Sequence, residues 1–175
     1  DEVERLLEEA KKIVEEMKRL HEEILREVEE IVRELDEKHD KLLRDAEEIV
    51  KELKKEGNED KRTVEEILRR LEKVLKELRE EIEKINREIK KVVEEARKKS
   101  EDIIRRADKV LEDLDRAGVR EEMRRRLEKL VRDLREKSRE VNERIDKLLE
   151  ELHEKSERVK KTIDDLVEEV KDTLT

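Results

Sequence analysis

The stretch that decides the fold is residues 3–53, which reads VERLLEEAKKIVEEMKRLHEEILREVEEIVRELDEKHDKLLRDAEEIVKEL. Apolar residues recur in it at every eighteenth position, giving the columns Leu6/Ile24/Leu42, Leu7/Leu25/Leu43, Ala10/Val28/Ala46, Ile13/Ile31/Ile49, Val14/Val32/Val50 and Met17/Leu35/Leu53. Eighteen residues make five turns of an α-helix with 3.6 residues per turn. The stretch therefore predicts one long, nearly straight helix with a single apolar stripe.

The composition of the whole chain first suggests disorder, because 59% of its 175 residues are charged and it has no aromatic residue, proline or cysteine. The apolar period argues against disorder, since a disordered chain has no reason to keep a stripe in register over so many turns. The net charge of −9 comes from interspersed acidic and basic residues, not from a single block. This composition is typical of long helices packed on one another.

The same period continues through two further stretches, and each is predicted to be a helix. The three helices are expected at about residues 2–56, 59–117 and 120–172. Gly57 and Gly118 each stand where a left-handed residue would end a helix, and the connections they mark are short. Short connections turn consecutive helices antiparallel. We therefore predict an all-α, up-down-up three-helix bundle that forms one elongated domain over residues 1–175.

The start of the second helix has two candidate caps. Asn58 is one, and Thr63 with Glu66 spells a capping box as the other. Arg120 is a poor cap for the third helix, so that boundary is expected to shift by a few residues.

Each helix is predicted to supply fifteen layers to the core. The columns of the second and third helices include Leu75/Val93/Leu111, Leu78/Ala96/Leu114, Met123/Val141/Val159, Leu127/Ile145/Ile163 and Leu130/Leu148/Leu166. Three apolar residues fall outside the stripes, where the surface is otherwise nearly all charged: Leu20, Ala117 and Val119.

The stripes are broken by polar residues, and the breaks fall into two clusters when the layers of the three helices are matched. The first cluster is predicted to contain His21, Ser100 and Ser138, and the second His39, Asn86 and Ser156. All three serines of the protein stand at such core positions. Because a buried polar group without a partner costs about 1 to 3 kcal/mol, we predict that each cluster forms a buried hydrogen-bond network.

A local alternative stays open for these residues. A histidine at the edge of a slim core can turn its ring to water, and a core serine can bond the carbonyl four residues back. Three further polar residues stand at the flanks of the stripes as candidate network members: Asn142, His153 and Thr162.

Several classes of function are disfavoured by the same patterns. No metal is predicted, because His21 and His39 stand 18 residues apart and no HExxH-type spacing occurs. No catalytic residue or cofactor is predicted, because a His–Ser pair inside a filled bundle lacks a substrate pocket and an oxyanion site. Without a basic patch, a long apolar run or a targeting segment, we expect a soluble chain with no nucleic-acid or membrane partner, and its compartment stays open.

The strict stripes, glycine-marked loops and charged surface resemble those of computationally designed, parametrically generated helical bundles, and the resemblance covers the whole chain. It implies a hyperstable, monomeric scaffold with buried polar networks, no natural biochemical function and no required partner. The alternative is a designed interaction module. Apolar doublets such as Leu6/Leu7 and Ile13/Val14 widen the stripe enough to bind a fourth helix or another copy of the chain.

The histidines add one expectation about stability. If the imidazoles are buried and neutral, desolvation lowers their pKa in the folded state. Stability that is present above about pH 6.5 would then be lost as the pH falls.

Overall fold

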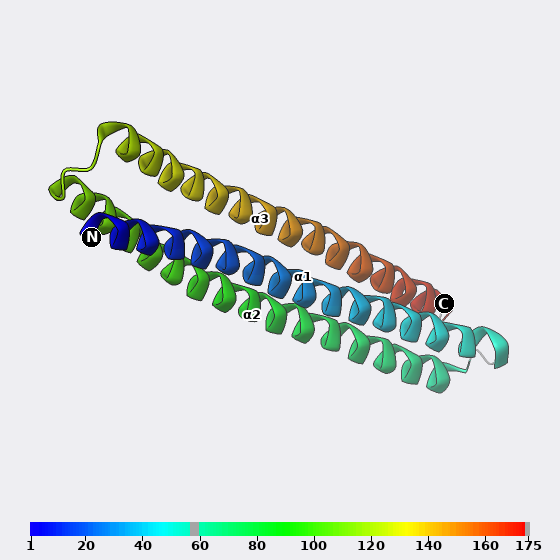
Figure 1. The fold of residues 1–175 in the computed structure, drawn as a ribbon. Coiled ribbons are helices and arrows are strands. Elements are labelled where there is room, and N and C mark those ends of the chain that lie inside the picture. The colour runs from blue at the N-terminus through cyan, green and yellow to red at the C-terminus, as the bar shows by residue number, and fades with distance from the viewer. Residues whose placement is uncertain (57–59, 174–175) are drawn as a thin grey trace. The chain divides into compact units, whose positions relative to one another are not determined.

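The computed structural model describes residues 1–56 and 60–173. Its elements are α1 (Glu2–Glu56), α2 (Lys61–Arg116) and α3 (Glu121–Asp172), which pack as a three-helix bundle (Figure 1). The predicted all-α class is confirmed, and the helix bounds agree with the prediction to within about two residues. Over the described residues, no helix has an apolar segment long enough to cross a membrane.

The chain divides into two compact units, and each unit takes one half of every helix. The first unit comprises Asp1–Glu29 with Ile89–Lys147, and the second comprises Glu30–Glu88 with Leu148–Thr175. Within each unit, one half of α2 packs with the opposite halves of α1 and α3, so α2 runs antiparallel to both. The eighteen-residue period therefore places equivalent layers in both units.

The second unit has a continuous aliphatic core built from all three helices. Its most deeply buried members have at most 1% of their surface exposed: Ala46, Val64, Leu71, Leu78, Ile163 and Val170. Because the apolar stripes face one another here, the charged residues between them are left to the surface.

In the first unit, two apolar side chains near the start of α3 are exposed. Met123 and Leu130 are each 37% exposed, although their columns predict core positions, and this prediction is wrong. Val141, the column partner of Met123, is 4% exposed. Leu114, Val64 and Val170 also stand near the ends of their stripes and are at most 1% exposed, so the exposure depends on how closely the start of α3 approaches the other two helices, which the period does not contain.

A second prediction about the stripes is also wrong. Leu20, which falls outside the period, is only 7% exposed. It lines a surface hollow together with Ile103 of α2 and the ion pair between Arg106 and Glu16. Its burial depends on how closely α2 approaches α1, and the spacing of residues along α1 does not contain that information.

The end of α2 confirms the role predicted for Gly118. Its φ is +75°, and its N–H donates to the carbonyl of Asp115 at 3.2 Å. The N–H of Val119 donates to the carbonyl of Leu114 at 3.3 Å. These two bonds make a Schellman motif, which satisfies carbonyls that the helix end would otherwise leave without partners.

Replacing Gly118 with alanine is expected to lower the free energy of unfolding by about 1 kcal/mol. A Cβ at this position would meet no atom within 4 Å, so the penalty comes from the left-handed backbone alone. Urea denaturation of Gly118→Ala and Gly118→Asn measures it. Asparagine tolerates this backbone better and should cost less, so equal losses for the two variants would contradict the explanation.

The start of α2 differs from both predicted caps. The N–H of Val64 donates to the backbone carbonyl of Asp60 at 3.0 Å, so Asp60 is the residue before the helix. Thr63 lies within the first turn, and the predicted capping box is wrong. Gly57 and Asn58, to which the sequence assigned the end of α1 and the other cap, lie outside the described residues.

Candidate functional site

A buried histidine in the first unit bonds to a serine on another helix. His21 of α1 is 5% exposed, and its Nε2 lies 2.8 Å from the hydroxyl oxygen of Ser138 on α3. Ser100 of α2, the third residue predicted for this cluster, donates to the sulfur of Met17 at 3.9 Å instead. The described contacts therefore form a His–Ser pair with Ser100 beside it.

The second unit holds an equivalent pair eighteen residues further along both helices. His39 is fully buried, and its Nε2 lies 3.3 Å from the hydroxyl oxygen of Ser156. Ser156 donates its single hydroxyl hydrogen to the carbonyl of Leu152 at 2.9 Å. Its oxygen is then an acceptor, so we infer that His39 carries its proton on Nε2. Ser156 thus bonds both to the carbonyl four residues back in its own helix and to His39 of α1.

Within the part of the chain that the structure describes, each imidazole also has one nitrogen without a partner. The Nδ1 atoms of His21 and His39 are buried and make no hydrogen bond within the described residues. A buried polar atom in this state is uncommon and costs stability. Both pairs are therefore only partly satisfied.

Burial lowers the pKa of both imidazoles below the usual value of 6.5. The cause is desolvation, because a buried site disfavours the charged form of histidine. The positive charge of Lys137 lowers the pKa of His21 further. Both histidines are therefore neutral at pH 7.

His39 has additional charged neighbours whose effects oppose one another. Lys155 acts with burial to lower its pKa, whereas Asp36 and Asp40 raise it. Lys155 is 26% exposed and forms ion pairs with both of these carboxylates. Sequence analysis missed this group, although the spacing of Asp36 and Asp40 by four residues places both on one face of α1.

We expect the free energy of unfolding to fall as the pH is lowered from 8 to 5.5. Histidines in the unfolded chain take up protons near pH 6.5, while the folded chain resists protonation because its pKa values are lower. The free energy of unfolding therefore keeps its full value above about pH 6.5. It falls as the pH is lowered through the pKa values that the two histidines have in the folded chain. Urea midpoints at both pH values measure the change.

The double variant His21→Leu with His39→Leu should lose most of this pH dependence. His153 is exposed and serves as the matched control, so His153→Asn should keep it. If the double variant and the parent chain lose stability equally, burial of the two imidazoles is not the cause.

Four other residues named by the sequence do not join the pairs. Asn86 is exposed, and the prediction that it lies in a buried cluster is wrong. Asn86 stands at the edge of its stripe. A side chain at this edge points toward water more readily than toward the core. Asn142, His153 and Thr162 are also exposed, and the hydroxyl of Thr162 bonds the carbonyl of Arg158 at 2.9 Å.

A cavity of about 80 Å³ lies beside the first pair. It is lined by residues of all three helices, among them His21, Ala96, Ser100, Ser138 and Asn142. Ala96 is a feature that sequence analysis did not single out. The signal was present in the column Leu78/Ala96/Leu114, where one member is much smaller than its two equivalents.

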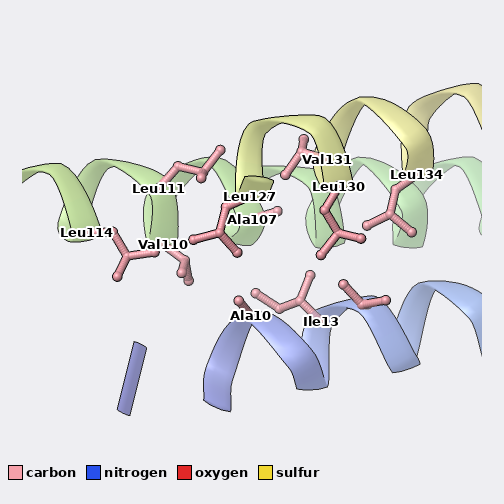
Figure 2. Close-up of a pocket in the computed structure, with 11 residues that line it drawn as sticks. Ala10, Ile13, Ala107, Val110, Leu111, Leu114, Leu127, Leu130, Val131 and Leu134 are labelled. Atoms are coloured by element: carbon pink, nitrogen blue, oxygen red, sulfur yellow. The ribbon is translucent and has the colours of Figure 1, made fainter. Parts of the chain in front are cut away.

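A second pocket in the first unit is wholly apolar in its lining. Figure 2 shows Ala10 and Ile13 of α1 facing Leu127, Leu130 and Leu134 of α3, with residues of α2 behind them. Leu130, which lines this pocket, is 37% exposed.

Within the described residues, no three histidine, cysteine, aspartate or glutamate side chains gather in a way that could hold a metal ion. The two His–Ser pairs put an imidazole beside a hydroxyl, but a pair with this geometry activates a nucleophile only when a substrate and an oxyanion site lie within reach. Ser156 already donates its hydroxyl hydrogen to Leu152. The chemistry that the pairs supply directly is hydrogen bonding between α1 and α3.

Comparison with models of known protein families gave no match, and comparison with curated protein sequences gave none either. Among solved structures, the chain is similar to a computationally designed three-helix bundle. The alignment covers 98% of this chain and 85% of that one, with 18% sequence identity and a TM-score of 0.44.

Proposed function

We propose that this chain is a designed structural scaffold, a single three-helix bundle whose polar pairs set the alignment of its helices. Aliphatic packing supplies its stability, and we expect that stability to be high. The proposal assigns no catalytic activity and needs no cofactor. It is supported above all by one observation: both His–Ser pairs join α1 to α3 with the same separation of 117 residues.

This common separation matters because it makes one alignment of α1 and α3 better than its neighbours. Sliding α3 by one helical turn would leave His21 and His39 without their serine partners, while many aliphatic contacts could form again. Each unpaired buried imidazole would cost about 1 to 3 kcal/mol. Polar groups placed in this way select an alignment at some cost in stability.

The test replaces both pairs by apolar residues in one variant, His21→Leu, Ser138→Val, His39→Leu and Ser156→Val. We expect its thermal midpoint to stay the same or rise, while its methyl NMR spectrum shows more than one set of signals. The parent chain should show one set. A single set in the variant would contradict the role in alignment, whatever its stability.

A second candidate function is favoured by the exposed apolar side chains at the start of α3. Met123 and Leu130 are each 37% exposed beside an apolar pocket, which would suit an interaction module. Residues 1–9 carry five acidic residues and one basic residue, whereas residues 124–132 of α3 carry five basic residues and one acidic residue, so a second copy of the chain offers a surface of complementary charge. This candidate predicts self-association through the first unit.

Light scattering over a range of protein concentrations separates the two candidates. A constant mass near 21.3 kDa supports the closed scaffold. A dimer that the substitution Leu130→Glu returns to monomer supports the interaction module. A monomer that gains mass only when an amphipathic helical peptide is added would instead indicate a fourth helix as the partner.

A further inference from the structure

The cavity beside His21 is a feature that the scaffold role does not require. It measures about 80 Å³ and combines polar and apolar walls. Its polar lining consists of the imidazole of His21, the hydroxyls of Ser100 and Ser138, the amide of Asn142, and the charged side chains of Arg97 and Glu101. Aliphatic side chains such as Val141 form much of the remaining wall.

The eighteen-residue period supplies an internal comparison for this cavity. In the second unit, the positions equivalent to Ala96 and Ser100 are held by Leu78 and Ile82. Leu78 is 1% exposed and packs in the core of that unit. The cavity of the first unit therefore lies where Ala96 and Ser100 are smaller than their equivalents. These two residues are one helical turn apart on α2, and the His–Ser pair beside them is repeated in the second unit.

The polar groups around the cavity have hydrogen-bonding capacity to spare. The Nδ1 of His21 has no partner within the described residues, and the one bond that Ser100 donates goes to a sulfur, which is a weak acceptor. Buried polar groups in a space of this size normally bind ordered water or a small ligand. The groups on the wall offer both donors and acceptors.

The size and charge of the site limit what it can bind. An engineered cavity of about 150 Å³ holds benzene, so 80 Å³ suits roughly three or four non-hydrogen atoms. An ion is disfavoured, because Arg97 and Glu101 place one charge of each sign on the wall, so an ion of either sign meets a like charge there and also loses its water. A hydroxyl fits, because it donates and accepts at once, and the aliphatic wall suits a short carbon chain.

We propose that this cavity is a binding site for a short-chain alcohol, whose hydroxyl bonds to the polar wall formed by His21, Ser100 and Ser138 and whose carbon chain lies against the aliphatic wall. Water occupies the site when the alcohol is absent. The equivalent position beside His39 does not bind the alcohol, because Leu78 and Ile82 occupy that space. The proposal is independent of the scaffold role and of self-association.

The experiment is a titration of the chain with 2-propanol at pH 8 in deuterated water, followed by proton NMR. The chain has no Phe, Tyr or Trp, so the aromatic ring signals come from His21, His39 and His153 alone. We expect the ring signals of His21 to shift along a saturating curve with a Kd of about 1 to 10 mM. The signals of His39 and His153 should change only linearly, through the general effect of the solvent.

The matched control is the variant Ala96→Leu with Ser100→Ile, which gives the first unit the larger side chains found at the equivalent positions of the second. It should remove the saturating shift of His21 and leave the other two histidines unchanged. If His21 shifts linearly like His39 in the parent chain, the proposal is overturned, and this comparison stands even if the variant does not fold. A saturating shift that persists in the folded variant would overturn it as well, because the site would then lie elsewhere.

Discussion

Replacing Ile163 with alanine is expected to lower the free energy of unfolding by about 4 kcal/mol. Ile163 is fully buried in the core of the second unit, where side chains of all three helices surround it. The variant loses the transfer free energy of the removed carbons and leaves a cavity that the packed helices can only partly close. Urea denaturation followed by circular dichroism gives the change directly.

Leu130→Ala is the matched control for this prediction. It removes a similar number of carbons from the same helix, but Leu130 is 37% exposed, so we expect a loss of about 1 kcal/mol or less. Similar losses for the two variants would mean that the start of α3 is packed as tightly as the second unit. The cost of truncating a side chain would then not depend on its exposed fraction.

Replacing Ser156 with valine is expected to cost about 1 to 3 kcal/mol. The variant replaces the hydroxyl with a methyl and adds a second methyl, and it removes the acceptor for Nε2 of His39, which is 3.3 Å away. Since Nδ1 of His39 already has no partner within the described residues, the buried ring would then make no hydrogen bond there. The carbonyl of Leu152 keeps its backbone bond within the helix, so the loss belongs to the imidazole.

Two further variants test this explanation. Adding His39→Leu to Ser156→Val should recover most of the lost stability, because both members of the pair are then apolar. Ser138→Val should cost less than Ser156→Val, because the cavity beside His21 admits water to the ring. If the double variant is as unstable as Ser156→Val alone, the loss comes from packing and not from the unpaired ring.

The positions of the helices could be predicted because their information is local. The eighteen-residue period, the absence of proline and the two glycines set helix type, length and order, and Gly118 has the left-handed backbone that its place in the sequence indicates. The pairing of histidines with serines also followed from the sequence. Counting layers from each end of the bundle brings His21 to Ser138 and His39 to Ser156, and both bonds are present.

Other features depend on distances between helices, which the order of residues along one helix does not contain. Leu20 is buried although it breaks the period, whereas Met123 keeps the period and is exposed. Asn86 stands in an apolar column but at its edge, and it faces water. For each residue, the distance to the neighbouring helix decides whether the side chain is covered or exposed to solvent.

The sequence by itself thus determined that the chain forms three antiparallel helices with polar residues at matched heights, because period and loop length act along one chain. Only the tertiary structure decided how those residues are satisfied. It made pairs of the predicted clusters and left one nitrogen of each imidazole without a partner within the described residues. It also opened a cavity lined by His21 and Ala96, whereas Leu78, at the position equivalent to Ala96, packs in the core of the second unit. The physical reason is that hydrogen bonds and cavities depend on differences of about one ångström between helices, and a binary pattern of apolar and polar residues does not encode differences of that size.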